Sequence, residues 1–483
     1  MRRILFRADG GKTIGWGHVV RSSALADMLR EDFEVHFYIR TPGEALAAEI
    51  LNAGARLHAL RDDISYEEDA VLFSEQLTVS DIVVLDGYSF GTGYQQIIKR
   101  TGCKLVCIDD IFQYHFVADA IINHGGGLQA QVYSKEPFSR VYLGPRYALL
   151  RRPFLEEKRP DDQAGDDKIF VCMGGADAHN DTLKVLKFLE RGEKKYDCVV
   201  ILGKDYVYGE ELDAFRRETE LRIDVVRGAD AHQMAGLMTR CRYAVCPPST
   251  VSYEYLSVGG ELYIHMIAEN QKNIRRFFLE TGIAFPMEDF PEDNVLRINK
   301  SKEQRDFYFD GHSPSRLCNV FRKLALEPEL TARRANSTDA ELLYDWVSDP
   351  LVRKSALNSD SISFDSHKQW FEGKLRDPRS FIYIVEHKGE PVGQVRFDVR
   401  DGRAEATIDY SISRQYRGRG WGEPLIRCAG KGFKIEFGGT VNLVAIVKEQ
   451  NIPSCKVFEG LQFEKVREEW HLGDRCNMYT LTI

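Results

Sequence analysis

A histidine at the start of a predicted helix is the first candidate for chemistry. Residues 7–21 read RADGGKTIGWGHVVR: a strand ends near Asp9, a glycine-rich loop follows, and a helix opens near His18. Glycines let a ligand approach the backbone, and a helix N-terminus offers unpaired N–H groups and partial positive charge. His18 is therefore placed to act as a neutral general base in a cleft. The same spacing also fits a plain tight turn made by Gly15 and Gly17, with His18 capping or packing.

Three further polar segments each follow a predicted strand and open a helix. They are residues 174–180 (GGADAHN), 247–254 (PPSTVSYE) and 268–271 (AENQ). The first suits a diphosphate cradle, and the second supplies the hydroxyls of Ser249 and Thr250. Each is weak alone, but such junctions gather at one edge of a parallel sheet, so the three together predict a ligand site.

The elements that position these residues follow from hydrophobic patterning. Over about the first 310 residues, short apolar runs alternate with helix-period segments, which is typical of parallel α/β sheets. The expected strands are 3–8, 34–39, 81–86, 104–109, 120–123, 169–173, 198–202, 223–226, 244–246 and 262–267. A charged stretch around 156–168 interrupts the alternation and is predicted to be a linker between two halves, with a cleft between them.

The pattern changes after about residue 326. Strands predicted at 381–386, 392–399 and 406–413 are separated by the turns KGEP and RDGR, which indicates an antiparallel meander in an α+β unit. We therefore expect an α/β fold of two Rossmann-like halves, at 1–152 and 168–326. These are joined by a linker at 153–167 and followed by an α+β domain at 329–483.

Composition narrows the class of protein. The 483 residues carry a net charge of −8, which argues against a nucleic-acid binder. No stretch approaches the roughly 20 apolar residues of a membrane helix, and no signal-peptide core follows Met1, so we expect a cytoplasmic protein. The ten cysteines include no C-x-x-C pair, and no Asp/His cluster has metal-ligand spacing. The reaction is accordingly predicted to need no metal.

The first 310 residues resemble the UDP-sugar hydrolase of pseudaminic acid biosynthesis, a family with a GT-B-like fold. The resemblance rests on the motif around His18 and on the segments LDGY (85–88), CIDD (107–110), GPRYALLR (144–151), GGADAHN and ENQ. It implies catalytic roles for His18, Asp86, Tyr88 and Asn270. It also implies UDP or substrate binding by Asp9, Gly15, Gly17, Arg21, Gly174, Gly175, Ser249, Thr250, Glu254 and Gln271. Ser22 departs from a cysteine that is common in the family.

The activity implied by this resemblance is release of UDP from UDP-2,4-diacetamido-2,4,6-trideoxy-β-L-altrose. UDP is already a good leaving group, so one base that activates water on the opposite face suffices, and inversion is expected. Helix N-termini of the second half would hold the diphosphate.

The last 155 residues resemble GNAT N-acetyltransferases. Gln415-x-x-Gly418-x-Gly420 at a strand-to-helix junction matches the family's pyrophosphate loop, and the meander before it and Asn451 after it strengthen the match. The resemblance implies acetyl-CoA as co-substrate. Its binding residues would be Gln415, Arg417, Gly418, Arg419, Gly420, Gly422 and Asn451.

One departure from the GNAT pattern concerns proton transfer. Many GNAT enzymes carry a tyrosine seven residues after this asparagine as the acid for the CoA thiolate, whereas this chain has Phe458. The role could pass to Tyr416, Tyr410, Ser454 or water, and Glu405 or Asp409 could deprotonate the amine. A GNAT unit that binds acetyl-CoA without turnover is the alternative.

Together the two resemblances predict a bifunctional enzyme of pseudaminic (nonulosonic) acid biosynthesis, for flagellin or surface glycan. It would acetylate the 4-amino group of UDP-4-amino-4,6-dideoxy-N-acetyl-β-L-altrosamine and then remove UDP. The expected partners are a UDP-amino sugar, acetyl-CoA and water, with no nucleic acid or membrane. The alternatives are a GT-B glycosyltransferase with a fused acetyltransferase, a hydrolase with a GNAT module that senses acetyl-CoA, or the same chemistry on another 2,4-diamino sugar.

Overall fold

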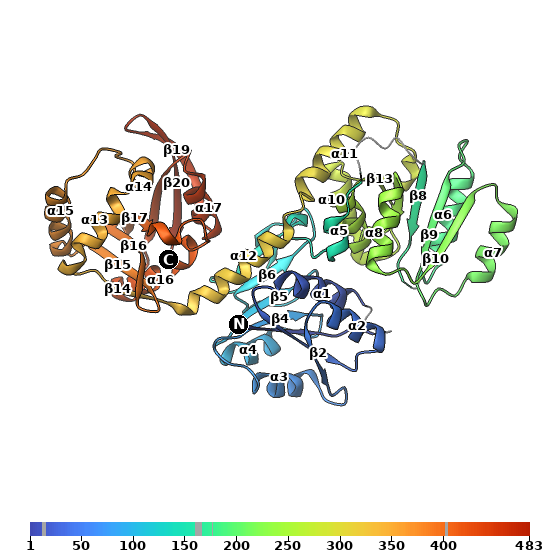
Figure 1. The fold of residues 1–483 in the computed structure, drawn as a ribbon, viewed down its shortest axis with the longest axis horizontal. Coiled ribbons are helices and arrows are strands. Elements are labelled where there is room, and N and C mark those ends of the chain that lie inside the picture. The colour runs from blue at the N-terminus through green and yellow to red at the C-terminus, as the bar shows by residue number, and fades with distance from the viewer. Residues whose placement is uncertain (12–15, 160–166, 176, 401–403) are drawn as a thin grey trace. The chain divides into compact units, whose positions relative to one another are not determined.

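The computed structural model describes residues 1–483 except 12–15, 160–166, 176 and 401–403, and it leaves the side chains of Ala45 and Asn270 undescribed. The chain divides into two compact units, residues 1–318 and 319–483. Figure 1 shows the elements of each unit. The division falls within helix α12 (Ser313–Leu326) rather than at the expected boundary between 326 and 329.

The N-terminal half of the first unit is built on a seven-stranded parallel sheet with the order β3-β2-β1-β4-β5-β6-β7. Its strands are β1 (Arg3–Ala8), β2 (Glu34–Arg40), β3 (Arg56–Leu60), β4 (Ile82–Asp86), β5 (Lys104–Ile108), β6 (Ala120–Asn123) and β7 (Arg140–Leu143). Its helices are α1 (Gly17–Leu29), α2 (Glu44–Asn52), α3 (Tyr66–Ser74) and α4 (Thr92–Arg100), with short 3-10 turns at Ala130–Val132 and Pro145–Tyr147. The strand order reverses direction between β1 and β4, which is where ligands bind in sheets of this type.

The second half of this unit repeats the same design with the order β10-β9-β8-β11-β12-β13, again parallel. Its strands are β8 (Lys168–Cys172), β9 (Asp197–Leu202), β10 (Arg222–Arg227), β11 (Tyr243–Cys246), β12 (Glu261–Ile264) and β13 (Phe285–Pro286). Its helices are α5 (Arg152–Glu156), α6 (Asp181–Glu190), α7 (Gly209–Glu218), α8 (Ala231–Arg240), α9 (Thr250–Val258), α10 (Lys272–Thr281) and α11 (Val295–Tyr308), with 3-10 turns at Glu269–Gln271 and Met287–Asp289. The two parallel sheets agree with the predicted Rossmann-like halves.

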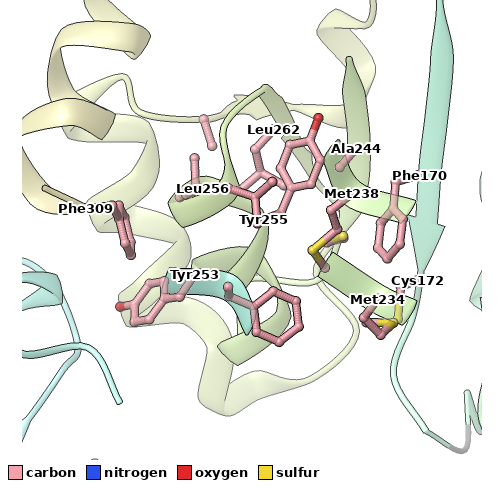
Figure 2. Close-up of a cluster of buried hydrophobic side chains, with 14 of the residues drawn as sticks. Phe170, Cys172, Met234, Met238, Ala244, Tyr253, Tyr255, Leu256, Leu262 and Phe309 are labelled. Carbon is pink, nitrogen blue, oxygen red and sulfur yellow. The ribbon is translucent and has the colours of Figure 1, made fainter. Parts of the chain in front are cut away.

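The core of the second half is a cluster of apolar and sulfur-containing side chains. Tyr255, Met234 and Met238, from α8 and α9, pack against Phe170 and Cys172 of β8 (Figure 2). This cluster supports one face of the sheet, while α6 and α7 cover the other face through a separate cluster. The helices that carry the second half's candidate ligand residues are therefore held by a continuous core.

The predicted linker at 153–167 differs from the structure in its first residues. They continue α5, whose Phe154 is fully buried in the cluster of Figure 2. The charged residues that interrupt the alternation come only after this helix. The predicted strand 262–267 also ends early, at Ile264, because the chain then turns into a loop in which Ile267 N–H donates to Gln271 Oε1 at 3.0 Å.

The second unit is a seven-stranded mixed sheet with the order β14-β15-β16-β17-β18-β20-β19. Its strands are β14 (Leu330–Arg334), β15 (Ser380–His387), β16 (Glu390–Val399), β17 (Glu405–Ile412), β18 (Asn442–Lys448), β19 (Glu464–His471) and β20 (Asp474–Thr482). Its helices are α13 (Ala340–Ser348), α14 (Pro350–Ser355), α15 (Phe364–Arg376), α16 (Gly422–Phe437) and α17 (Ile452–Gly460), with 3-10 turns at Glu327–Glu329, Ser337–Asp339 and Arg414–Tyr416. The expected antiparallel meander corresponds to β15, β16 and β17. Residues 401–403 of the predicted RDGR turn lie outside the described residues.

One strand pair in this sheet is parallel and short. Strands β17 and β18 pair only over Glu405–Thr407 and Asn442–Val444, after which they diverge, while β17 stays paired with β16 along its length. The sheet therefore opens between two of its central strands. On either side of the sheet, α16 and α17 cover one face and α13 and α15 the other.

Candidate functional site

The reversal point of the first sheet brings together a histidine and an aspartate. His18 is the second residue of α1, which leaves β1, and Asp86 is the last residue of the neighbouring strand β4. His18 Nδ1 lies 2.7 Å from Asp86 Oδ1, and both side chains are buried. The first-turn position of His18 and the strand-end position of Asp86 create this pair from residues 68 apart in the chain.

Asp86 is held in its ionised form by its neighbours. Arg21, one turn after His18, donates through Nε and NH2 to the Asp86 carboxylate at 2.6–3.1 Å, and Ser22 Oγ donates at 2.9 Å. Burial alone opposes ionisation, but the Arg21 charge and the hydrogen bonds from Arg21 and His18 outweigh it and set the pKa of Asp86 to about 2. A fixed carboxylate therefore faces the imidazole at neutral pH.

Tyr88 and Asp110 complete this cluster. Arg21 NH1 donates to Asp110 Oδ2 at 2.9 Å, and Tyr88 Oη lies 3.4 Å from the same oxygen. The Tyr88 ring meets His18 edge to face, with centroids 4.7 Å apart. Burial and the Asp110 charge raise the pKa of Tyr88 to about 12, so its phenol stays protonated.

A cavity of about 160 Å³ adjoins the cluster and lies between the two halves of the first unit. It contains five of the predicted residues, and these come from both halves: Arg21, Tyr88, Ser249, Thr250 and Gln271. His18 and Asp86 do not line the cavity, but both contact Arg21, and His18 also contacts Tyr88. The structure thus brings the helix openings of both sheets to one space, as parallel topology leads one to expect.

Sequence reasoning missed the histidine that lines this cavity, His124. His124 directly follows β6, and its backbone oxygen accepts a hydrogen bond from Tyr253 Oη of α9 at 2.9 Å. Burial and the nearby Arg21 charge lower the pKa of His124 to about 4, so the imidazole is neutral. The available signal was a histidine followed by three glycines directly after a buried strand.

The glycines after His124 serve the contact between the halves. A side chain at Gly126 would clash with the Phe277 ring of α10, so only glycine fits there. Together with the Tyr253 hydrogen bond, this contact fixes the loop after β6 against the second half.

Two predicted binding residues lie in buried ion-pair networks instead of the cavity. Asp9 accepts from Arg7 at 2.5 Å, from the backbone of Arg40 at 2.9 Å and from Tyr66 at 3.0 Å. Glu254 accepts from Arg151 Nε and NH2 at 3.0 and 2.8 Å, and burial raises its pKa despite this partner. The contacts of Asp9 and Glu254 indicate that they position the strand end and α9.

The remaining predicted residues of this unit are glycines or lie outside the description. Gly17 is the exposed first residue of α1, and the Cβ positions of Gly174 and Gly175 meet open space after β8. Gly174 adopts φ +91, a conformation that favours glycine. Gly15 and the side chain of Asn270 lie outside the described residues.

In the second unit, the opening between β17 and β18 forms a cavity of about 500 Å³. Tyr410 Oη lies 3.0 Å from Ser454 Oγ, and both side chains line it. Asn451 also lines it and caps α17 by accepting from Ser454 N–H at 3.3 Å. Burial raises the pKa of Tyr410 to about 12, although the hydrogen bond with Ser454 acts in the opposite direction. A protonated phenol is therefore present in this cavity.

Phe458 lies where the sequence comparison placed the missing tyrosine. Its buried ring lines the same cavity and meets the Tyr410 ring edge to face, with centroids 5.8 Å apart. Phe458 has no hydroxyl and cannot donate a proton. The Tyr410 ring packs against it, so a phenol hydroxyl is still present beside this position in the cavity.

The glycine-rich loop reaches this cavity through its glycines. Gly418, Gly420 and Gly422 line it, and a side chain at Gly422 would meet Val457 at 2.7 Å. Arg417 also lines it but bonds to Asp349 and to the carbonyl of Ile412. Gln415 and Arg419 are exposed and are not among the lining residues.

The candidate acids and bases of this unit fall into two groups, those that line the cavity and those that do not. Asp409 is exposed and lines the cavity, 3.7 Å from Arg396. Glu405 sits at the closed end of β17 and pairs with Arg400 at 2.8 Å, and Tyr416 packs against Trp421 outside the lining. Geometry therefore favours Asp409, Tyr410 and Ser454 over Glu405 and Tyr416.

In the part of the chain that the structure describes, no group of three or more His, Cys, Asp or Glu side chains could hold a metal ion. Within the same residues, no helix is long and apolar enough to cross a membrane. Within the described residues, no two cysteines are joined by a disulfide.

Comparisons with known proteins agree with the two units. Residues 329–464 match the family model described as an acetyltransferase (GNAT) domain. This match supports acetyl-CoA as the co-substrate of the second unit. A solved structure, spermidine N-acetyltransferase from Vibrio cholerae in complex with CoA and spermine, is similar over 32% of this chain and 95% of its own, with 15% identity and a TM-score of 0.30.

Three curated relatives cover the first unit. The UDP-2,4-diacetamido-2,4,6-trideoxy-β-L-altropyranose hydrolase of Campylobacter jejuni is 28% identical over 58% of this chain and 97% of its own. The spore coat polysaccharide biosynthesis protein SpsG of Bacillus subtilis is 26% identical over 60% of this chain and 85% of its own. An uncharacterized protein of Methanocaldococcus jannaschii is 24% identical over 97% of this chain and 99% of its own, so it shares both units. The chain is thus an enzyme that combines an N-terminal region related to UDP-sugar hydrolases with a C-terminal GNAT acetyltransferase domain.

Proposed function

We propose that the chain acetylates the 4-amino group of UDP-4-amino-4,6-dideoxy-N-acetyl-β-L-altrosamine and then hydrolyses the product to free sugar and UDP. The printed activity of the Campylobacter relative supports the second step, and the GNAT match supports the first. The observation that carries the proposal is the buried pair of His18 and Asp86 beside a cavity between two Rossmann-like halves.

In the hydrolytic step, His18 acts as the general base. Because Asp86 is ionised, it accepts the Nδ1 proton of His18 and leaves the Nε2 lone pair to take a proton from water. The water oxygen forms a bond to the anomeric carbon as the bond from that carbon to the UDP oxygen breaks, and UDP leaves with the electron pair. Asp86 then stabilises the imidazolium, as in serine-protease triads.

The surrounding residues bind and orient the substrate in this proposal. Tyr88 shields His18 and faces the sugar, while Arg21 holds Asp86 and Asp110 in place. Ser249, Thr250 and Gln271 line the second half's side of the cavity and bind UDP with the loop of Gly174 and Gly175, since helix N-termini stabilise phosphate charge. Asn270 is proposed to contact the sugar from the adjoining turn.

In the acetyl-transfer step, the sugar's neutral amine attacks the thioester carbon of acetyl-CoA. The C–S bond breaks, the amine loses a proton and the CoA thiolate gains one. We assign the donor to Tyr410, whose hydroxyl is joined to Ser454 in the cavity, and the acceptor of the amine proton to Asp409. The backbone of the loop from Gly418 to Gly422 and the start of α16 would bind the pyrophosphate.

Fusion of the two catalysts has a kinetic rationale. The product of acetylation is the substrate of hydrolysis, so tethering both sites raises the effective concentration of one for the other. The Methanocaldococcus relative aligns over almost the whole of both chains, so the same two regions are joined in it.

Mass spectrometry of the full chain with the 4-amino UDP-sugar tests the proposal. With acetyl-CoA, we expect free diacetamido sugar, UDP and CoA in equal amounts. His18→Asn should stall at the acetylated UDP-sugar, with UDP release slowed by about 10²–10⁴-fold and acetylation unchanged. The matched control is His115→Asn, at an exposed histidine of the same half, which should leave both steps unchanged.

The outcomes separate the alternatives. UDP release only from pre-acetylated substrate, with no acetylation, would make the second unit an acetyl-CoA-binding module. No UDP release from either substrate until a sugar or lipid acceptor is added would replace hydrolysis with glycosyl transfer. Faster turnover of a different 2,4-diamino sugar stereoisomer would reassign the substrate, while acetylation and hydrolysis would remain the two reactions.

A further inference from the structure

The loop after β6 carries a ring nitrogen that the rest of the protein does not use. His124 lines the cavity between the two halves of the first unit, and its imidazole is half-buried. Its Nδ1 accepts a hydrogen bond from the Leu149 backbone N–H at 3.4 Å. Its Nε2 makes no hydrogen bond with any of the residues that the structure describes. Polar groups inside proteins are normally paired, so this nitrogen is a candidate to meet a ligand.

The hydrogen bond from Leu149 decides which nitrogen of His124 carries the proton. A ring nitrogen that accepts an N–H bond has no proton of its own, so the proton of the neutral ring lies on Nε2. The ring is neutral because burial and the Arg21 charge lower its pKa to about 4, although Asp110 and Asp86 act in the opposite direction. His124 therefore offers the cavity an uncharged N–H donor at neutral pH.

The contacts of the loop hold this donor in one position. Asn123 Nδ2 donates to Tyr133 Oη at 2.9 Å, and Asn123 Oδ1 accepts from the Gly125 N–H at 2.7 Å. The His124 backbone oxygen accepts from Tyr253 Oη at 2.9 Å, and the rings of these two residues meet edge to face with centroids 5.2 Å apart. A donor that is fixed before the substrate arrives needs little reorganisation during the reaction.

The neighbours of His124 indicate which part of the substrate it meets. Tyr253 lies one turn after Ser249, the residue that precedes α9 and lines the same cavity. A helix start of this kind favours phosphate groups. Arg21, which bonds to Asp86 beside the proposed base, also lines the cavity, and its charge acts on His124. His124 thus neighbours both the helix that would hold the diphosphate and the cluster that would orient the base.

From these contacts we infer that His124 is a further catalytic residue, whose Nε2–H donates a hydrogen bond to a β-phosphate oxygen of the UDP leaving group. The inference rests on the proposed function, because it takes Ser249 and Thr250 as the UDP side of the cavity. Negative charge grows on the β-phosphate as the bond from the anomeric carbon to the UDP oxygen breaks, and a fixed N–H donor stabilises that charge. The proton stays on Nε2, since UDP leaves with the electron pair as an anion.

Isothermal titration of the full chain with UDP and with UMP tests this contact, because only UDP has a β-phosphate. His124→Phe keeps a ring against Tyr253 but has no donor. It should weaken UDP binding by about tenfold or more, since hydrogen bonds to charged groups contribute at that level, and leave UMP binding unchanged. His124→Gln, whose amide can donate from a similar position, should restore part of the UDP affinity. His115→Phe, at an exposed histidine of the same half, should bind both nucleotides as wild type does.

Kinetics of the same variants separate a transition-state contact from plain binding. With the diacetamido UDP-sugar as substrate, His124→Phe should lower kcat for UDP release by about 10²-fold, as loss of an oxyanion donor does. The change in KM should be smaller, because the contact strengthens as charge develops. Acetyl transfer by the same sample should proceed at the wild-type rate.

Three results would overturn the inference. They are an unchanged UDP affinity in His124→Phe, equal weakening of UDP and UMP, and a wild-type chain that shows no preference for UDP over UMP. Failure of the hydrolytic proposal looks different. A wild-type chain that prefers UDP to UMP but releases no UDP from the sugar would refute hydrolysis, and loss of that preference in His124→Phe would still support the contact.

Discussion

The two candidate sites of this chain differ in the charge of the side chains around their titratable groups. In residues 1–318 the histidine lies in a cluster of ionised side chains, with Asp86 between His18 and Arg21. In residues 319–483 the candidate donor Tyr410 lies among neutral groups, bonded to Ser454 and packed against Phe458. In the proposed mechanism, the first site keeps a base oriented, and the charges around Asp86 serve that purpose. The second site keeps an acid protonated, and burial of Tyr410 serves that purpose.

The difference matches what each proposed leaving group needs. UDP leaves as a stable anion and needs no acid. The proposed first site accordingly supplies a base for water and helix N-termini for the phosphates. A CoA thiolate is a poorer leaving group and is helped by a proton. If Tyr410 is the donor that we propose, charge density alone would not identify the second site, because Tyr410 and Ser454 form a neutral pair.

Asp86→Asn should give the largest separation between the two sites. The amide cannot hold His18 in the same tautomer, so UDP release should fall by about 10⁴-fold, as in triad enzymes. Acetyl transfer measured on the same protein sample is the control. A fall of less than tenfold would contradict the role given to Asp86.

Tyr410→Phe should affect the second site alone. Loss of the donor should slow CoA release by about 10²-fold or more, with UDP release from pre-acetylated substrate unchanged. Phe458→Tyr offers a sharper test, because it places a phenol where many GNAT enzymes have one. In the Tyr410→Phe background it should restore part of the rate; full activity of Tyr410→Phe alone would exclude the assignment.

The ionised cluster should also leave a signature in folding. The pKa of Asp86 is about 2 in the folded chain and about 4 when unfolded, so its contribution is complete above pH 4 and is lost as pH falls toward 2. This loss amounts to about 2 kcal/mol. Urea unfolding at pH 5 and pH 3 should show a smaller pH dependence for Asp86→Asn than for wild type, and equal dependence would refute the linkage.

The smallest expected effect compares two acids on one strand. Asp409→Asn removes the carboxylate that lines the cavity and should lower acetyl transfer by about tenfold near neutral pH. Glu405→Gln, at the closed end of β17, should change it less than twofold, about the level of an exposed ion pair. Equal effects of the two variants would reassign the base.

Much of the fold follows from the sequence because buried parallel strands are continuous apolar runs. Strands β1 and β6 have the predicted bounds, and most others differ by one or two residues. Strand β3 was not predicted because it is a half-exposed edge strand, whose residues Arg56–Leu60 form no apolar run. Strands β7, β13, β14 and β18 to β20 are also absent from the predicted strands.

The site was predictable only in part. His18 was visible because its loop and helix are contiguous in sequence, and Asp86 entered through the family resemblance. Asp110 and His124 became visible only when the sheet order placed the ends of β5 and β6 beside β4. Asp9 and Glu254 show the converse: each follows the expected pattern, but long-range partners such as Arg40 and Arg151 engage them.

The divergence of β17 from β18 has a consequence for how the second unit responds to ligands. Beyond Thr407, one side of β17 has no strand neighbour among the described residues, so the backbone groups on that side find their partners outside the sheet, as the Ile412 carbonyl does with Arg417 Nε. An extended ligand in that gap would take the place of a missing strand. Amide hydrogens of residues 408–412 that exchange quickly in the free protein would then become protected, and the melting temperature of the unit would rise with the logarithm of ligand concentration above Kd.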